Sequence, residues 1–427
     1  MSGFNPYFTN DGSVGLYNED FDDIYHSAQG ALTEAYEKFI YPSNIINILN
    51  NDTIKVLDIC FGIGYNTKSF LNSIIKIKKF EKNFLKNFSL PNCSIESIHT
   101  NNIIKTFVNN LLSDKNTYID KRYTDKILQK IYIKAIDTDK NLALLSPFIK
   151  TGKKFFKNKD LAFYDKISKY FTQKPVVTCK IDNSINFLLL LQIYNNNPEY
   201  CADKTLNLIL ENNDFEPYFE PEMVGLFKAF KYKNSINNKY LTKITNLHNI
   251  YYKYISSCYK KRLKSYNLLD IDFNLKISDA RKELLSDKNT YDLIFLDAFS
   301  PNKCPCLWTY DFFKELYKHL NSDGMLLSYS TSAPVRSAMQ ESGFYIGNSF
   351  NKRLNKNCGT VAVKNPELIK HPLSEFDLGL LKTKAGIFYR DENLTEQNEA
   401  IIRRRNSEVK LSERISSTSY INSKKNH

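Results

Sequence analysis

The chain has 427 residues, of which 25% are charged and 42% hydrophobic, a composition typical of folded globular proteins. Its 59 Lys and Arg against 46 Asp and Glu give a net charge of +13, which favours a polyanionic partner. No apolar run, Phe187–Leu191 included, approaches the roughly 18–20 residues of a membrane span, and the first residues lack the pattern of a secretory signal. We therefore expect a cytoplasmic protein.

Eight cysteines are scattered along the chain without a CxxC pair, which predicts reduced thiols rather than a zinc ribbon or a disulfide framework. Cys304 and Cys306 form a CxC pair. Because the six His residues are also scattered and offer no obvious further ligands, we predict no metal site.

Predicted strands and helices alternate along most of the chain. Apolar residues at helical spacing predict a helix from Ala28 to Tyr41, ended by Pro42. Apolar runs then predict short strands at 54–60, 131–136, 273–278, 291–296, 325–329 and 360–363. Helices are predicted between them at about 65–80, 280–285, 308–320 and 335–342, with a turn at 321–324. This alternation predicts an α/β protein with a mostly parallel, doubly wound sheet.

Two segments interrupt this pattern and are interpreted as insertions, at about 81–130 and 150–265. From Thr151 to Ser265 the chain carries 19 Lys and Arg against 10 Asp and Glu, so +9 of the net charge lies there. We predict that its cluster Lys260, Lys261, Arg262 and Lys264 contacts RNA phosphates. The alternative is a Lys-rich solvated face that reflects codon bias, because the chain is also rich in Asn and Ile.

A glycine turn follows the first predicted strand. Gly62 and Gly64 allow backbone N–H groups to approach a ligand at a helix N-terminus. A dinucleotide fingerprint is incomplete, because Thr67 stands where its third glycine would be. Asp58, four positions before Gly62, instead favours S-adenosylmethionine, whose cationic amine and sulfonium need a nearby carboxylate. A plain strand-to-helix turn is the alternative.

Acidic residues also end later strands. Asp137 is predicted to accept the ribose hydroxyls of a nucleoside cofactor, with Asp139 as the competing candidate. Asp279 is a candidate for the adenine amino group, although a helix N-cap explains it equally well. Asp297 would face the crevice at the carboxyl ends of the strands. Phe299, two residues on, would place a flat ring beside that carboxylate, as a planar base bearing an amine requires.

Several segments together resemble the methyltransferases that complete 5-methylaminomethyl-2-thiouridine at the tRNA wobble position. They are the glycine segment, the run 296–308, the run 312–344, the opening 22–34 and the tail 386–394. The resemblance covers roughly residues 20–75, 130–145 and 270–405 and neither insertion. The first loop glycine of the family is Cys60 here, and the flavin oxidase domain of many members has no counterpart in this sequence.

The resemblance implies a class I, Rossmann-like fold and a methyl transfer from S-adenosylmethionine to the primary amine of 5-aminomethyl-(2-thio)uridine in tRNA. It implies a helical N-terminal lid over 1–50, the methyltransferase domain over 51–385 and a tail over 386–427. Asp297 would be catalytic, and Phe299 and Tyr25 would contact the substrate. The cofactor residues would be Asp58, Gly62, Gly64, Asn66, Asp137 and Asp279.

Three other classes stay open from the sequence. One is an aminopropyltransferase-like enzyme acting on a small amine, which usually has a second acid where Phe299 stands. Another is a non-catalytic RNA-binding protein that uses the basic insertion and needs no cofactor. An NAD dehydrogenase is disfavoured by the incomplete glycine pattern.

Overall fold

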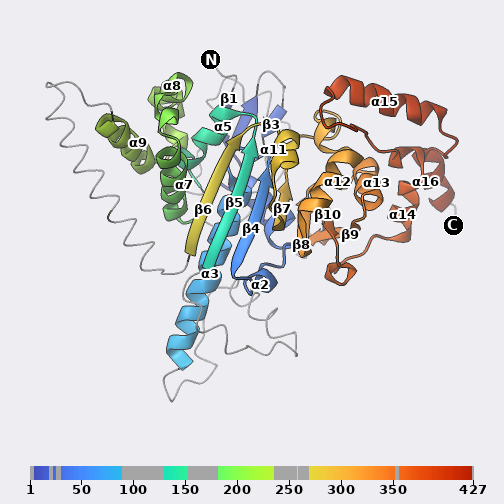
Figure 1. Ribbon diagram of the computed structural model, residues 1–427, viewed down its shortest axis with the longest axis horizontal. Coiled ribbons are helices and arrows are strands. Elements are labelled where there is room, and N and C mark those ends of the chain that lie inside the picture. The colour runs from blue at the N-terminus through green and yellow to red at the C-terminus, as the bar shows by residue number, and fades with distance from the viewer. Residues whose placement is uncertain are drawn as a thin grey trace.

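A central seven-stranded sheet organises the protein (Figure 1). The structure, a computed structural model, describes residues 4–18, 23–25, 30–88, 129–151, 181–234, 257, 269–351 and 355–425. The strand order is β6-β5-β4-β7-β8-β10-β9. The strands are β4 (Thr53–Ile59), β5 (Gln129–Asp137), β6 (Leu269–Ile277), β7 (Tyr291–Leu296), β8 (Leu320–Ser328), β9 (Tyr345–Asn351) and β10 (Lys356–Val363). β4 to β8 run parallel, and β10 is antiparallel to β8 and β9, which confirms the predicted mostly parallel, doubly wound sheet.

The direction of winding reverses at β4, because β5 and β6 follow on one side of it and β7 and β8 on the other. Backbone hydrogen bonds hold the carboxyl ends of these strands together, from Cys60 N to Ile136 O at 2.9 Å and from Asp297 N to Ile59 O at 3.3 Å. A reversal of this kind opens a crevice outside the carboxyl ends of the strands, where open α/β sheets bind ligands.

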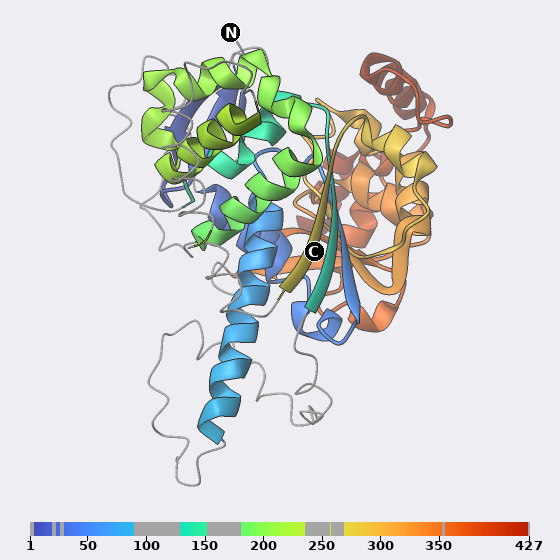
Figure 2. The same cartoon turned by 60° about the vertical axis from the view of Figure 1, so that its left-hand side comes forward.

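Helices cover both faces of the sheet (Figures 1 and 2). The π-helical segment η1 (Ala35–Ile40) and the helices α3 (Tyr65–Phe88) and α7 (Asn183–Asn196) pack on one face, where the rings of Phe39 and Phe70 meet Phe295 edge-on. On the other face, α11 (Ala280–Ser286), α12 (Tyr310–His319) and α13 (Ala333–Glu341) enclose a second core that contains the fully buried Trp308. Burial on both faces explains why β7 is an unbroken apolar run after Asp292.

The N-terminal segment differs from the predicted helical lid. A three-stranded antiparallel sheet, β1 (Phe4–Phe8), β2 (Val14–Asn18) and β3 (Asp23–Tyr25), precedes the short helix α1 (Ala31–Glu34) and η1. The Phe8 ring stacks on Tyr218 at 4.7 Å, so residues far along the chain provide the surface on which these strands pack. The predicted helix over 28–41 is confirmed from Ala31 onward.

The described part of the second predicted insertion forms α7, α8 (Lys204–Glu211) and α9 (Pro221–Asn234), close to α5 (Lys140–Leu145) (Figure 1). α3 runs to Phe88, beyond its predicted end, and its C-terminal half extends away from the sheet in Figures 1 and 2. The basic cluster at 260–264 lies outside the described residues. Within the described ranges, every helix is too short or too polar to cross a lipid bilayer.

Several predicted boundaries were wrong toward the C-terminus. β8 begins at Leu320 and absorbs the predicted turn at 321–324, and β9 was not predicted at all. β9 lies at the sheet edge, so it lacks the continuous apolar run of a central strand.

The tail forms α14 (Glu375–Leu381), α15 (Asn398–Leu411) and α16 (Ser417–Lys425). Shorter elements are α2 (Ile45–Ile48), η4 (Ser146–Phe148), η6 (Pro198–Ala202), η7 (Asn213–Tyr218), η9 (Pro305–Leu307), η10 (Pro366–Leu368) and η11 (Lys384–Gly386).

Candidate active site

The glycine loop between β4 and α3 lies at the carboxyl end of β4, where the direction of winding reverses. Cys60, Gly62 and Gly64 have positive φ angles of 62°, 55° and 80°. A Cβ at Gly64 would lie 2.5 Å from the Phe61 ring, whereas a Cβ at Gly62 would meet no atom closer than 3.9 Å. Cys60 has a left-handed backbone conformation, which glycine adopts with less steric strain than any other residue. This explains why the wobble uridine methyltransferases have glycine at this position.

Asp58 is fully buried just before this loop. Thr67 Oγ1 donates to its Oδ2 at 2.6 Å, and within the described chain its buried Oδ1 has no hydrogen-bond partner. Burial, with smaller contributions from the charges of Asp297 and Asp137, raises the pKa of Asp58 to about 8, although the hydrogen bonds from Thr67 lower it. A buried acceptor that lacks a donor is costly, so this oxygen fits the cationic amine of a bound cofactor.

Asp137 ends β5 beside the glycine loop. Its Oδ2 accepts from Gly62 N at 2.7 Å and its Oδ1 accepts from Asp139 N at 2.8 Å. Burial raises the pKa of Asp137 to about 6, although these backbone hydrogen bonds lower it. Asp139 instead caps α5 by accepting from Leu142 N at 3.0 Å. The two carboxylates therefore have separate surroundings, and Asp137 is the one that contacts the glycine loop.

Asp297 follows β7 and is half-buried. Asn66 in the first turn of α3, predicted as a cofactor contact, donates its Nδ2 to Asp297 Oδ2 at 2.9 Å. The structure thus places Asn66 against the predicted catalytic carboxylate, although the two residues are distant in sequence.

Sequence reasoning missed a charged pair near Asp297. Lys38 Nζ lies 2.6 Å from Glu34 Oε1 and 5.5 Å from the centre of the Tyr329 ring. Burial lowers the pKa of Lys38, but Glu34 and, to a lesser degree, Asp297 raise it to a net value above the usual one. The i,i+4 spacing of Glu34 and Lys38 was visible in the sequence, but only the fold brings η1 to this crevice.

Two side chains donate hydrogen bonds to the backbone of the loop that carries Phe299. Trp308 Nε1 donates to Phe299 O at 2.8 Å, and the Tyr329 hydroxyl donates to Ala298 O at 2.9 Å. The side chain of Phe299 is half-buried. Tyr25 ends β3, and its side chain lies outside the described residues.

Asp279 ends the loop after β6 and caps α11 by accepting from Arg281 N at 2.8 Å, so the N-cap alternative is confirmed. Burial raises its pKa, but the Arg281 hydrogen bonds and charge lower it to a net value below the usual one. Ser278 N donates to Asp137 O at 2.9 Å, which places Asp279 near the Asp137 strand end.

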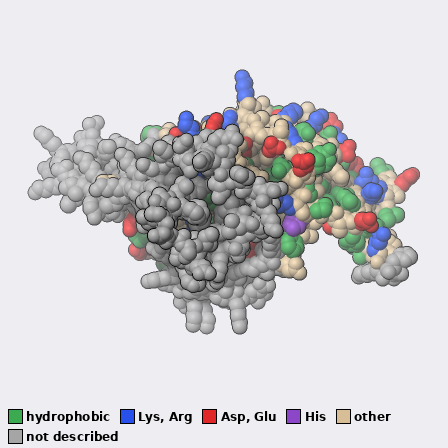
Figure 3. Space-filling view, turned by 90° about the horizontal axis from the view of Figure 1, so that it is seen from below, with side chains coloured by type: hydrophobic (Ala, Val, Ile, Leu, Met, Phe, Trp, Pro, Cys, Tyr) green, Lys and Arg blue, Asp and Glu red, His purple; other side chains and the backbone are tan. Residues whose placement is uncertain are grey.

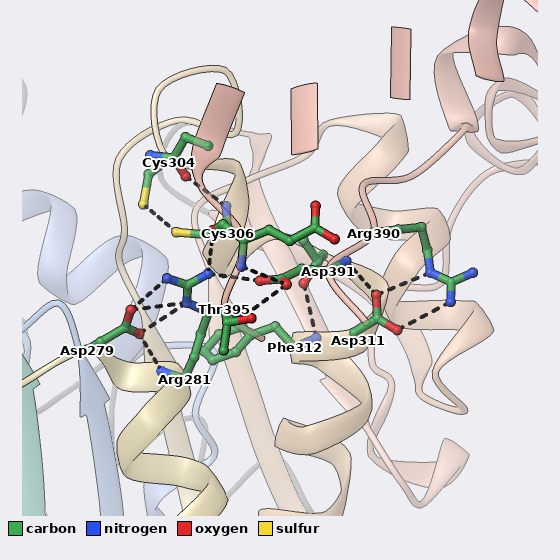
Figure 4. Close-up of polar contacts among 12 residues, drawn as sticks. Asp279, Arg281, Cys304, Cys306, Asp311, Phe312, Arg390, Asp391 and Thr395 are labelled. Carbon is green, nitrogen blue, oxygen red and sulfur yellow. Dashed lines mark hydrogen bonds and ion pairs between the residues drawn. The ribbon is translucent and has the colours of Figure 1, made fainter. Parts of the chain in front are cut away.

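The CxC pair lies in the same region, with the Cys304 and Cys306 sulfurs 3.6 Å apart (Figure 4). Over the described part of the chain, no group of three or more His, Cys, Asp or Glu side chains could hold a metal ion.

Comparison with known proteins shows which family part of the chain resembles. Residues 241–365, a stretch that contains β6 to β10, match a family model described as S-adenosyl-L-methionine-dependent methyltransferase. An uncharacterized protein from Methanocaldococcus jannaschii is 37% identical over 147 residues, which are 34% of this chain and 41% of that protein. The match therefore spans less than half the length of that relative.

Two solved structures are similar over most of the chain. MnmC2 from Aquifex aeolicus is 20% identical with a TM-score of 0.48, covering 96% of this chain and 86% of that chain. Spermidine synthase from Thermotoga maritima is 10% identical with a TM-score of 0.35, covering 96% and 84% respectively.

The strand order defines a class I fold, and residues 241–365 within it match the S-adenosyl-L-methionine-dependent methyltransferase family. Its cofactor is S-adenosyl-L-methionine. Burial raises the pKa of the Cys60 thiol well above its usual value, and the nearby charges of Asp137, Asp297 and Asp58 also raise it, so the three carboxylates lie around the start of the glycine loop.

Proposed function

We propose that the protein methylates the primary amine of 5-aminomethyl-(2-thio)uridine at the tRNA wobble position. The observation that carries the proposal is the half-buried Asp297 carboxylate at the end of β7, held by Asn66, with Phe299 two residues on. A carboxylate with an aromatic residue two positions further on suits a planar base that carries an amine. The resemblance of the segments around these residues to the wobble uridine methyltransferases supports the choice of substrate.

The chain's own residues would position the amine and remove its proton. When bound, the cofactor supplies an electrophilic methyl group on a sulfonium. Asp297 would accept the amine proton, so that the nitrogen lone pair is available for in-line attack, while Phe299 stacks on the uracil ring. Most of the rate enhancement would come from this positioning and from presenting an uncharged amine.

The cofactor would lie across the carboxyl ends of β4, β5 and β6. Asp58 Oδ1 would accept from the amine of the methionine moiety, because within the described residues it is a buried acceptor without a donor. Asp137 would accept the ribose hydroxyls and Asp279 the adenine amino group. Gly62 and Gly64 would let the backbone approach the cofactor closely.

A folded RNA needs a wider contact surface than this crevice. The net charge of +9 over 151–265 supports tRNA as the partner. On the face in Figure 3, both Lys or Arg and Asp or Glu side chains are visible among the described residues. On the basis of this charge we propose that the basic insertion binds RNA, and its cluster at 260–264 is the first region to test.

The test is a methylation assay with purified protein, S-adenosyl-L-methionine and tRNA that carries 5-aminomethyl-2-thiouridine. Mass spectrometry of the nucleosides should show conversion to 5-methylaminomethyl-2-thiouridine, and the Asp297→Ala variant should convert it far more slowly. Spermidine and putrescine serve as alternative substrates. Methylation of these amines with no change in the tRNA would favour the small-amine alternative.

A further inference from the structure

Cys304 and Cys306 follow Phe299 in the loop after β7, and their sulfurs are 3.6 Å apart (Figure 4). Pro305 separates them and begins the short helical turn η9. A disulfide has about 2.05 Å between its sulfurs, so a movement of roughly 1.5 Å would join this pair. Both cysteines are free thiols and only half-buried, so a small oxidant has access to them.

Hydrogen bonds from two other parts of the chain hold this turn in place. Cys304 N donates to Ser300 O at 2.9 Å. Cys306 N donates to Asn398 Oδ1 at 3.4 Å, and Asn398 Nδ2 donates to Lys303 O at 3.4 Å. Because Asn398 is the first residue of α15, the C-terminal helix fixes the backbone of both cysteines. The short distance between the sulfurs is therefore a property of the folded loop.

A fixed positive charge lies beside Cys306. The Arg281 guanidinium is held between Asp279 and Asp391, with Nη2 2.7 Å from Asp279 Oδ2 and Nη1 2.8 Å from Asp391 Oδ2 (Figure 4). The hydrogen bond from Cys304 and the charge of Arg281 lower the pKa of the Cys306 thiol, although burial and the two carboxylates act in the opposite direction. The Arg281 charge thus favours the thiolate of Cys306, which is the form of cysteine that reacts with oxidants.

The partner sulfur and two other cysteines have the opposite tendency. The hydrogen bond to Cys306, together with burial, raises the pKa of Cys304. Burial raises the pKa of Cys60 well above its usual value and that of Cys201 to about 11. Cys306 is therefore suited to attack an oxidant, and Cys304 is the neighbouring thiol that can resolve the product.

We propose that Cys304 and Cys306 form a redox modification site, which a hydroperoxide converts to a reversible disulfide. The Cys306 thiolate attacks one peroxide oxygen, the O–O bond breaks, and a sulfenic acid and a hydroxide ion form. The Cys304 sulfur then attacks the Cys306 sulfur, so the S–S bond forms and the S–O bond breaks. The Cys304 proton leaves with that oxygen as water, and the hydroxide takes up the proton that Cys306 released on ionising. One hydrogen peroxide is thus reduced to two water molecules while two thiols are oxidised.

Trp308 provides a reporter for this site, because it is the only tryptophan of the chain. It follows Cys306 by two positions, and its Nε1 donates to Phe299 O at 2.8 Å. Closure of the disulfide should therefore change its fluorescence, so that the rate of oxidation can be followed in solution.

The test treats the full-length protein with hydrogen peroxide and follows intact mass, peptide maps and Trp308 fluorescence. We expect wild type to lose the mass of two hydrogen atoms, the disulfide to map to Cys304 and Cys306, and dithiothreitol to reverse the change. Cys304→Ser should stop at a sulfenic acid on Cys306, which dimedone traps. Arg281→Met should react several-fold more slowly, and Arg281→Lys, which keeps the charge, should stay closer to wild type.

Cys358→Ser is the matched control, because Cys358 is also half-buried but lies in β10. Its rate of oxidation and its peptide map should equal those of wild type. A disulfide between any other pair, unchanged thiols in wild type, or oxidation of Cys304→Ser to the same product would each show that the proposal is wrong. Because the readout is the state of the thiols, the outcome of the tRNA methylation assay does not affect it.

Discussion

Asn66 donates its side-chain amide to Asp297 at 2.9 Å, although the two residues are separated by 231 positions in the chain. The bond joins the first turn of α3 to the loop after β7, across the β4–β7 strand pair. The glycine loop that would hold the cofactor and the carboxylate that would receive the substrate are therefore fixed relative to each other. A methyl transfer depends on such alignment of its two reactants.

Replacing Asp297 with Ala should lower turnover by roughly 10²–10⁴, the usual effect of losing a general base. Cofactor affinity should stay within a few-fold, because the remaining cofactor carboxylates are unchanged. Single-turnover methylation of tRNA and calorimetry with S-adenosyl-L-methionine measure the two effects. Near-normal turnover would remove Asp297 from the catalytic role.

Replacing Asn66 with Ala should lower kcat about tenfold and move the rising limb of the pH–rate profile to higher pH. The Asn66 amide stabilises the ionised form of Asp297, so its loss raises the pKa of that carboxyl. Asn72→Ala is the matched control, because Asn72 lies on the same helix and donates instead to the Tyr36 hydroxyl at 2.7 Å. An unshifted profile in Asn66→Ala would mean that this contact does not tune Asp297.

Replacing Asp137 with Ala should weaken S-adenosyl-L-methionine binding about tenfold or more, because a hydrogen bond to a charged group contributes about 1.5–3 kcal/mol. Asp139→Ala should chiefly reduce stability, by about 0.5–2 kcal/mol, because it removes the N-cap of α5. Calorimetry and urea unfolding of both variants separate the effects. A larger loss of affinity in Asp139→Ala would reverse the assignment.

The two loop glycines should respond differently to Ala. Gly64→Ala places a Cβ 2.5 Å from the Phe61 ring and 2.7 Å from Ser146 Oγ, in addition to the strain at its φ of 80°. Gly62→Ala has only the backbone strain, about 1–2 kcal/mol. We expect Gly64→Ala to lower the free energy of unfolding by several kcal/mol more. Equal losses by chemical denaturation would show that the loop relaxes around the added methyl group.

The stability of the ligand-free protein should fall as pH rises from about 4 to 8. Burial raises the pKa of Asp58 from 3.8 to about 8, so the folded state keeps a proton that the unfolded state has lost. The contribution of Asp58 to the free energy of unfolding is therefore fully present below the pKa that this group has in the unfolded state. It is lost as the pH rises toward the pKa that the group has in the folded state. The pKa of Asp137 is raised from 3.8 to about 6, so this group also makes the free energy of unfolding fall with rising pH, between those two values.

Asp58→Asn isolates the Asp58 contribution, because it cannot ionise. Its unfolding free energy, followed by urea denaturation at several pH values, should be flatter than that of wild type between pH 6 and 8. Calorimetry in buffers of different ionisation enthalpy should show that wild type releases more protons than the variant when S-adenosyl-L-methionine binds. Identical pH slopes for the two proteins would show that Asp58 is already ionised in the fold.

The local pattern of apolar residues was enough to predict the central strands of the sheet. The runs at 54–60, 131–136 and 291–296 are strands because their apolar residues are buried on both faces of the sheet, and such runs are visible without any partner. The placement of Asp137 and Asp297 at the carboxyl ends of parallel strands follows from that pattern, and the strand order shows that these two strands flank β4. The cofactor class followed from the spacing of Asp58 and Gly62, and the family match agrees with it.

Only the tertiary structure decided which side chains meet. The contacts of Asn66 with Asp297, of Lys38 with the Tyr329 ring, and of Arg281 with Asp391 join elements whose adjacency depends on strand order. Hydropathy periodicity reports whether a residue is buried but not what it is buried against. The N-terminal strands were missed for the same reason, because the surface on which they pack includes Tyr218, more than 200 positions away along the chain.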